Sequence, residues 1–430
     1  MTKTTQPKER ALVVGVNVNQ DPYFQESIKE LKNLAHACDI EPVAELLQNL
    51  PRPHAALYVG SGKLEEIKAL IDAEEIDVII FEDELSPSQI RNLSKHVGDV
   101  EILDRTRLIL DIFANRAKTK EAKIQVEIAR LRYALPRLRE TNQDFGHQRG
   151  GSGTTNRGSG ETKQELKRRK VEDKITELEH ELKNIAQQRQ VTRKKRAASG
   201  VPIVALVGYT NAGKSTFMNA MVSQYQQDEE KLVFEKDLLF ATLETSIRNI
   251  KFDNGRTILL SDTVGFINKL PHHLVKAFHS TLEEVKEADL LLHVVDAANP
   301  NHAQQLAVTN DTLADIKAAH VPQILIYNKA DLMTEPPLGA SENTWHISAK
   351  KRTGLLPVID AITEQLFADH KRCWLLIPFQ QGQIVSHLKA QAVIHQLEHV
   401  ETGTRIEVEL SEADQERYKS YICASSDISF

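Results

Sequence analysis

Short apolar runs alternate with longer, mostly polar stretches over residues 11–104. The apolar runs have the length of buried strands, and the polar stretches have the length and spacing of helices. The predicted strands are 11–16, 56–59, 77–81 and 100–103, and the predicted helices are 24–37, 63–73 and 88–97. Strands that alternate with helices favour a parallel sheet, so this region is predicted to be an α/β domain with a mostly parallel sheet.

After residue 104 the pattern becomes long and helical. Apolar residues recur at steps of three and four in two stretches, which is the spacing of a coiled-coil seam. They are Ile124, Ile128, Leu131 and Leu135 in the first stretch, and Val171, Ile175, Leu178, Leu182 and Ile185 in the second. Residues 141–160, between the stretches, hold six glycines together with Arg149 and Arg157. The pattern predicts an antiparallel helical hairpin with arms of about 35 residues, roughly 50 Å each, and a flexible basic tip. A plain linker is the alternative for the tip.

A second α/β pattern begins near residue 200, and a tail of strands and helices follows it. The tail is predicted to form a strand at 374–378, a helix at 384–390, a hairpin of strands at 392–400 and 405–410, and a helix at 412–421. That order is compatible with a small ferredoxin-like α+β sandwich. The predicted segments are an N-terminal α/β domain (1–104), the helical hairpin (105–199, tip 141–160), a second α/β domain (200–369) and the small α+β domain (370–430).

The net charge of −6 hides a strong segregation of charge. Residues 116–196 hold 22 Lys and Arg against 11 Asp and Glu, which leaves 32 basic and 49 acidic residues elsewhere. A cationic arm on an acidic body favours polyanionic partners such as nucleic acid. A solvated helix face without any partner is the alternative.

The composition excludes several classes of protein. Hydrophobic residues make up 41% and charged residues 27% of the 430, which are ordinary values for a globular chain. No run approaches the roughly 20 apolar residues that a membrane-spanning helix needs. The first residues lack an apolar stretch of the secretory type, and Cys38, Cys373 and Cys423 are too scattered for a disulfide framework or a zinc site. We therefore expect a cytoplasmic protein that does not insert into a membrane.

The strongest motif is GYTNAGKST at 208–216, which follows an apolar run and opens a helical pattern. It has the spacing of a phosphate-binding loop (P-loop) in the strand–turn–helix context that such a loop requires. Glycines let backbone N–H groups surround phosphates, Lys214 can neutralise the β- and γ-phosphates, and the Ser215 hydroxyl can bind Mg²⁺. The expected nucleotide contacts in this loop are Gly208, Asn211, Ala212, Gly213, Lys214, Ser215 and Thr216.

A second motif, DTVG at 262–265, ends another predicted strand. A carboxylate at the end of a strand is common by itself, but this one follows a P-loop in a second parallel strand. Asp262 is therefore expected to hold Mg²⁺, usually through water, and the Gly265 N–H is expected to contact the γ-phosphate.

Two further motifs, NKAD at 328–331 and SAK at 348–350, indicate which base is bound. A carboxylate can accept hydrogen bonds from both the N1–H and the N2 amino group of guanine, and adenine lacks that pair of donors. Asp331 is therefore expected to select guanine. The other expected contacts around the base are Asn328, Lys329, Ser348, Ala349 and Lys350. One such motif is weakly specific, but four in this order and spacing indicate a P-loop GTPase domain with GTP and GDP as ligands.

Several ungapped strings are more specific than these general motifs. They are RLILDIF at 107–113, RAKTKEAKIQVE at 116–127, LPRL at 135–138, FATL at 240–243 and DTVGFI at 262–267. Together with the glycine-rich tip, they make residues 10–370 resemble the HflX family of ribosome-associated GTPases. The resemblance implies an N-terminal α/β domain with a helical hairpin, a GTPase domain, and binding to the large ribosomal subunit. It also implies the splitting of stalled or idle ribosomes.

The resemblance further implies a first switch segment at 240–242. Thr242 is then the first choice for a Mg²⁺ ligand that senses the γ-phosphate, with Thr245 the second, and Phe240 becomes ordered with it when GTP binds. The chain departs from the family at two places: LETS follows the switch where LDPT is frequent, and the tip is longer and lacks a proline.

Phe266 follows the DTVG motif directly, where many small GTPases place the glutamine that orients the attacking water. A phenyl ring cannot hold that water, so we expect slow intrinsic hydrolysis that ribosomal subunits stimulate. A polar side chain such as Thr263 or His272 is the alternative. Asn211 is also the residue that K⁺-dependent GTPases carry in this loop, so K⁺ could act beside Mg²⁺. The expected catalytic groups are Lys214, Thr242 and Gly265, and the expected Mg²⁺ ligands are Ser215, Thr242 and Asp262.

The expected action is a switch in which bound GTP orders the two switch segments and presents the basic hairpin to ribosomal RNA. Arg149 and Arg157 would contact RNA phosphates. Three other functions stay open. They are an RNA remodeller with ATP bound at the GSGK turn of 60–63, a signalling GTPase that acts on proteins, and a relative of the tRNA-modifying GTPases. We expect a monomer, because the hairpin seam is satisfied within one chain.

Overall fold

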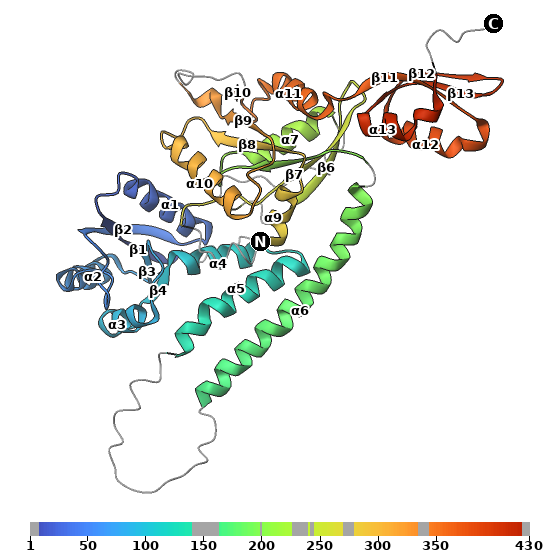
Figure 1. The fold of residues 1–430 in the computed structure, drawn as a ribbon. Coiled ribbons are helices and arrows are strands. Elements are labelled where there is room, and N and C mark those ends of the chain that lie inside the picture. The colour runs from blue at the N-terminus through green and yellow to red at the C-terminus, as the bar shows by residue number, and fades with distance from the viewer. Residues whose placement is uncertain are drawn as a thin grey trace, which may run out of the picture. The chain divides into compact units, whose positions relative to one another are not determined.

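The computed structural model describes residues 8–139, 163–197, 200–225, 240, 245–269, 279–333 and 344–423. The chain forms two compact units (Figure 1). The N-terminal unit comprises Met1–Gln187, Asp237–Leu243 and Asn268–His279, and the C-terminal unit comprises Gln188–Lys236, Glu244–Ile267 and Ser280–Phe430. Two short segments of the second α/β region, Asp237–Leu243 and Asn268–His279, therefore belong to the N-terminal unit.

The N-terminal unit contains a four-stranded parallel sheet in the order β2-β1-β3-β4. Its strands are β1 (Arg10–Val18), β2 (Glu41–Leu50), β3 (Val78–Phe81) and β4 (Glu101–Asp104), and its helices are α1 (Phe24–Ala37), α2 (Ser61–Glu74) and α3 (Pro87–Val97). The four residues of β3 are all buried, as expected of a central parallel strand. The predicted α/β domain with a parallel sheet is confirmed.

One predicted strand is wrong. The run at 56–59 lies in a turn, where His54 and Tyr58 form an isolated bridge, and β2 lies earlier in the chain. Tyr58 and Val59 lie in the hydrophobic core although they are not in a strand, which explains the apolar run. The sequence pattern did not predict β2, because β2 is an edge strand, and an edge strand tolerates Pro42 and several polar residues.

The helical hairpin consists of α5 (Lys120–Arg139) and α6 (Lys163–Ala197), which run side by side in Figure 1. The predicted seam is confirmed: the nine apolar residues at the predicted positions in the two stretches pack together in one cluster. Within the described residues, however, the two arms are unequal. Helix α6 has 35 residues, about 52 Å, whereas α5 has 20, about 30 Å. The first arm is shorter than expected because Ala117 is extended and ends a separate helix, α4 (Arg105–Arg116).

The predicted tip at 141–160, with Arg149 and Arg157, lies outside the described residues.

The C-terminal unit contains a six-stranded sheet in the order β10-β9-β8-β5-β7-β6, in which only β6 is antiparallel to its neighbour. The strands are β5 (Ile203–Val207), β6 (Ser246–Lys251), β7 (Thr257–Asp262), β8 (Leu290–Asp296), β9 (Gln323–Asn328) and β10 (Thr344–His346). The described helices around it are α7 (Lys214–Tyr225), α9 (His279–Lys286), α10 (His302–Asp315) and α11 (Leu355–Phe367). The carboxyl ends of β5, β7, β8 and β9 meet at one edge, where α/β proteins bind ligands.

The chain ends in a small α+β domain with the order β11-α12-β12-β13-α13-β14 and an antiparallel sheet in the order β12-β13-β11-β14. Its elements are β11 (Lys371–Ile377), α12 (Gly382–Gln391), β12 (Val393–Val400), β13 (Gly403–Leu410), α13 (Glu412–Arg417) and β14 (Ile422–Cys423). This connectivity is the ferredoxin-like one and confirms the prediction. The two-residue strand β14 was not predicted. Within the described part of the chain, no helix has the length and apolarity needed to cross a membrane.

Candidate nucleotide site

The P-loop occupies the turn between β5 and α7. Gly208 has φ +142°, and a Cβ there would lie 2.1 Å from the Val294 carbonyl oxygen of β8. Gly213 has φ +94°, and a Cβ there would lie 2.2 Å from Asn328 Nδ2. Both positions therefore require glycine, for the left-handed backbone and for space. Their spacing in the sequence follows from this packing against β8 and β9.

Lys214, the first residue of α7, is buried inside the loop. Its ammonium donates hydrogen bonds to the carbonyl oxygens of Gly208 at 3.0 Å and Tyr209 at 2.7 Å. Burial lowers the pKa of Lys214 to about 8, although the negative charge of Asp262 opposes that shift. Phosphate oxygens beside this ammonium would stabilise its charged form.

Ser215 and Asp262 lie together where the P-loop meets the end of β7. The Ser215 hydroxyl donates a hydrogen bond to Asp262 Oδ2 at 2.7 Å. A hydroxyl and a carboxylate are the hard oxygen ligands that Mg²⁺ takes next to phosphates, so this pair fits the ion that GTPase domains of this kind generally use.

The residues that follow Asp262 lie against the P-loop. Phe266 donates its N–H to the Gly208 carbonyl at 3.1 Å, and its carbonyl accepts from the Thr210 N–H at 2.7 Å. Gly265 is packed so closely that a Cβ would lie 2.8 Å from Thr210 Cα and 2.9 Å from Lys214 Nζ. The structure thus brings Gly265 to the loop, as the sequence predicted, and adds a backbone pairing that it did not predict.

Of the two alternatives for orienting a water, only Thr263 lies in the described residues. The Thr263 hydroxyl is buried and donates its hydrogen bond to the Leu206 carbonyl at 2.6 Å. His272 lies outside the described residues. The Phe266 side chain is buried, with 3% of its surface exposed.

Asn328 joins the P-loop to the SAK motif. Its amide donates to the Ala212 carbonyl at 2.9 Å, and its side-chain oxygen accepts from the Ala349 N–H at 2.9 Å. With only 2% of its surface exposed, Asn328 is fixed by these two bonds. One side chain therefore sets the distance between the phosphate and base ends of the site.

Asp331 lies in the short helix that follows Lys329. A hydrogen bond from Ser348 lowers the pKa of Asp331, and Lys351 acts in the same direction from 3.5 Å. Asp331 is therefore held as a carboxylate, the form that accepts two hydrogen bonds from guanine. Ser348 and Ala349 are buried, and Lys350 is exposed beside them.

Asp296, the last residue of β8, was not predicted from the sequence to be part of the site. Its carboxylate pairs with the Lys329 ammonium at 2.7 Å. Asp296 stands opposite Asn328 in the parallel register of β8 and β9, so a carboxylate at the end of an apolar strand was the available signal. The pair fixes the stem of Lys329 beside the site.

The other expected residues are either not described or lie in the N-terminal unit. Thr242, Arg149 and Arg157 lie outside the described residues. Phe240 is described but belongs to the N-terminal unit, where it is 2% exposed and packs edge-to-face on Phe113 with ring centroids 4.7 Å apart. In the GSGK turn, the Gly60 N–H donates to Gln48 and the ammonium of Lys63 pairs with Glu66.

Three family models match consecutive parts of the chain. They are described as a GTP-binding GTPase N-terminal region (residues 25–114), a GTP-binding GTPase middle region (116–196) and a 50S ribosome-binding GTPase (203–329). Together they cover β2 to β4 of the N-terminal sheet, almost all of the helical hairpin, and β5 to β9 of the sheet that carries the P-loop.

Curated relatives match over almost the whole length. The chain is similar to the GTPase HflX of Caldanaerobacter subterraneus subsp. tengcongensis, with 40% identity over 98% of this chain and 96% of the relative. It is similar to the GTPase HflX of Escherichia coli strain K12, with 38% identity over 88% of each. Among solved structures, a GTP-binding protein of Sulfolobus solfataricus in complex with GDP is 26% identical and covers 84% of this chain and 99% of its own, with a TM-score of 0.44.

Proposed function

The chain belongs to the HflX family of GTPases and hydrolyses GTP, and we propose that it binds the large ribosomal subunit through its basic hairpin and splits stalled or idle ribosomes. The nucleotide part is carried by the two hydrogen bonds of Asn328, which join the P-loop at Ala212 to the SAK motif at Ala349. The ribosomal part is supported by the positive charge of the hairpin and by the description of the matching model as a 50S ribosome-binding GTPase.

Each expected contact has a role in this proposal. Backbone N–H groups of the P-loop and Lys214 bind the phosphates, and Gly265 contacts the γ-phosphate. Ser215, Asp262 and Thr242 hold Mg²⁺, which neutralises charge on the β- and γ-phosphates when bound. The guanine contacts are Asn328, Lys329, Asp331, Ser348, Ala349 and Lys350. The remaining nucleotide contacts are Gly208, Asn211, Ala212, Gly213, Thr216 and Phe240.

The intrinsic rate of hydrolysis is slow in this proposal, and the large subunit raises it. Phe266 offers no hydrogen bond to a water, and the Thr263 hydroxyl is engaged with Leu206. A ribosomal contact that orders the switch segments or adds a catalytic group would supply what these residues lack. The protein acts as a cytoplasmic monomer, because the apolar seam of the hairpin is covered within one chain.

We also propose that K⁺ assists hydrolysis beside Asn211. Asn211 is exposed on the P-loop in the left-handed region, with φ 59°. A cation there would add positive charge where the γ-phosphate develops charge. GTP turnover should be several-fold higher in K⁺ than in Na⁺ at equal ionic strength. Asn211→Gly, which keeps the backbone conformation, should remove the difference. Equal turnover of the natural chain in the two salts would contradict the proposal.

The hairpin tip is tested by the double variant Arg149→Gln/Arg157→Gln. Each arginine that contacts a phosphate releases about one counterion, so binding to purified large subunits with a GTP analogue should weaken. We expect the affinity to fall roughly 10- to 100-fold, and the dependence of log Kd on log salt to shrink by about two.

The matched control is Lys371→Gln/Lys389→Gln, which removes the same charge from exposed positions of the small α+β domain. The affinity of both double variants for the large subunit is measured by co-sedimentation over a series of salt concentrations. If the two double variants bind alike, the tip does not contact the RNA, and the signalling alternative gains support.

A further inference from the structure

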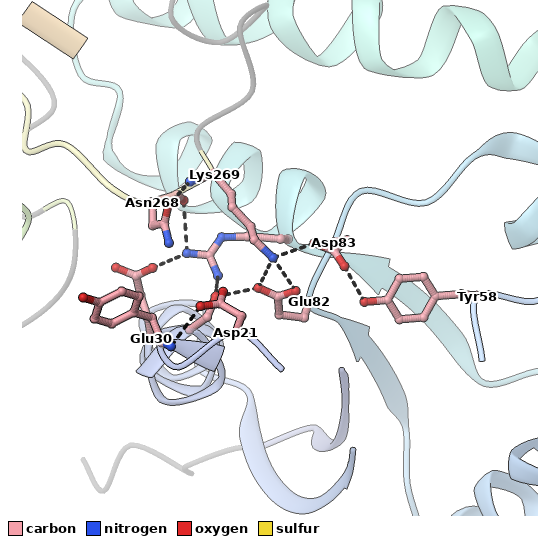
Figure 2. Close-up of polar contacts among 10 residues, drawn as sticks. Asp21, Glu30, Tyr58, Glu82, Asp83, Asn268 and Lys269 are labelled. Carbon is pink, nitrogen blue, oxygen red and sulfur yellow. Dashed lines mark hydrogen bonds and ion pairs between the residues drawn. The ribbon is translucent and has the colours of Figure 1, made fainter. Parts of the chain in front are cut away.

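Lys269 lies three residues after Phe266 and belongs to the N-terminal unit, whereas Phe266 belongs to the C-terminal unit. Figure 2 shows its side chain directed at Glu82 and Asp83. Its ammonium lies 2.7 Å from both carboxylate oxygens of Glu82 and 2.7 Å from Asp83 Oδ1. The backbone of Lys269 is in the left-handed region, with φ 55°. This conformation is uncommon for lysine and is maintained here by strong side-chain contacts.

The two carboxylates form a built receptor for that ammonium. They follow β3 directly, at the carboxyl edge of the N-terminal sheet between β1 and β3, where the strand order changes direction. Ser27 donates to Glu82 at 2.5 Å and Tyr58 donates to Asp83 at 2.7 Å, and the Glu82 side chain has 0% of its surface exposed. If Lys269 withdrew, a buried negative charge would lose its counterion, which is strongly unfavourable.

The titration behaviour agrees with this geometry. Burial acts to lower the pKa of Lys269, but the negative charges of Glu82 and Asp83 outweigh burial and raise it above its ordinary value. Lys269 is therefore charged at any physiological pH. Burial and the neighbouring Asp83 raise the pKa of Glu82, and the ammonium of Lys269 opposes that shift.

Helix α4 contacts both pieces of chain that join this unit. At its start, Arg105 donates to the Asn268 carbonyl at 3.2 Å and pairs with Glu30. Further along, Phe113 packs on Phe240. Helix α4 then continues through a short break into α5, and the Arg130 guanidinium of α5 pairs with Asp111 of α4. The same helix thus contacts the residues beside both switch motifs and the first arm of the hairpin.

The segment at 265–266, which precedes Lys269 in the chain, lies against the P-loop beside Lys214. Gly265 approaches Thr210 and Lys214 closely, and Phe266 is hydrogen-bonded to the P-loop backbone. A γ-phosphate that bound Lys214 would lie next to Gly265, so we expect the segment at 265–266 to shift when it enters. Because only Ile267 and Asn268 separate Phe266 from Lys269, the anchor opposes that movement.

We propose that Lys269 is a positioning residue for the GTPase cycle. Its ion pairs with Glu82 and Asp83 hold the end of the second switch segment in the N-terminal unit and disfavour the GTP-bound arrangement relative to the GDP-bound one. Release of this anchor, sensed by α4, transmits the nucleotide state to the helical hairpin. The inference rests on GTP binding and hydrolysis, and it is independent of any ribosomal partner.

The test uses the full chain with Lys269→Gln, and Lys32→Gln as the matched control. Lys32 forms an exposed ion pair with Glu45 in the same unit. The ratio of the Kd for GDP to the Kd for the non-hydrolysable analogue GMPPNP is measured for each protein. Coupling between two sites typically changes an affinity by about 5- to 150-fold, so Lys269→Gln should raise this ratio at least fivefold. Lys32→Gln should leave it unchanged, and Lys269→Arg should restore the natural ratio.

Hydrogen exchange of residues 105–139 supplies the second readout. In the natural chain these amides should exchange faster with GMPPNP than with GDP, and in Lys269→Gln they should exchange equally fast with both. A triple variant, Lys269→Gln with Glu82→Gln and Asp83→Asn, keeps the test valid if the single variant is unstable, because it removes the buried charges together with their counterion. A lowered melting temperature with an unchanged affinity ratio and an unchanged exchange difference would show a merely structural role and overturn the proposal.

Discussion

An Asp331→Asn variant is expected to lose affinity for GTP and to gain affinity for xanthosine triphosphate. The Asp331 carboxylate is kept ionised by Ser348 and Lys351, so it offers two acceptors and no donor. An asparagine would turn one acceptor into a donor, which opposes the N2 amino group of guanine but matches the carbonyl that xanthine has at that position. Sites built to hydrogen-bond a ligand reject a mismatched one strongly, and we expect a loss of roughly 10²- to 10⁴-fold for GTP.

The affinities for GTP and for xanthosine triphosphate are measured by competition with labelled GDP. The control is Asp311→Asn, which makes the same chemical change at an exposed position of α10, away from the site. It should bind GTP like the natural chain. Unchanged GTP affinity in Asp331→Asn would show that guanine is recognised elsewhere, and the RNA remodeller that uses ATP would have to be reconsidered.

A Ser215→Ala variant is expected to lose at least about 100-fold in GTP turnover. The substitution removes the hydroxyl that lies 2.7 Å from Asp262 Oδ2, and with it one proposed Mg²⁺ ligand. An interaction that neutralises charge developing on the transferred phosphate typically contributes this much to the rate. Binding of GDP, which has no γ-phosphate, should fall less.

Ser215→Thr is the matched control, because it keeps the hydroxyl and should keep most of the turnover. Initial rates are measured for the three proteins over a Mg²⁺ series that ends in excess EDTA. The natural chain should be inactive in EDTA, and Ser215→Ala should require more Mg²⁺ to reach its lower maximum. A Mg²⁺ dependence identical to that of the natural chain would remove Ser215 from the metal site.

Much of the fold could be predicted because local pattern and tertiary packing agree there. The apolar residues that recur at steps of three and four in the hairpin pack into one cluster. The order of strands and helices in the tail was enough to indicate the ferredoxin-like topology. The edge strand β2 could not be predicted, because one of its faces and one of its edges tolerate polar residues and Pro42. The apolar run at 56–59 was misleading, since Tyr58 fills the core from a turn.

The candidate site was predictable where its chemistry lies in contiguous motifs. The positions of Lys214, Ser215, Asp262 and Asn328 follow from the ends of adjacent strands, and the structure brings them together. The contact of Lys269 with Glu82 could not be predicted, because 187 positions separate the two residues and no local pattern marks either one. The segment boundaries at 104, 199 and 369 and the geometry of the tip stay predictions.

We propose that the large ribosomal subunit stimulates this GTPase through the hairpin tip. The most direct measurement is GTP turnover in K⁺ buffer, with and without purified large subunits, for the natural chain and for a deletion of 141–160. We expect slow turnover without subunits and strong stimulation of the natural chain by the subunits. The deletion variant should keep its basal rate and show no stimulation. Subunits that fail to stimulate the natural chain, although it binds GTP normally, would contradict the account.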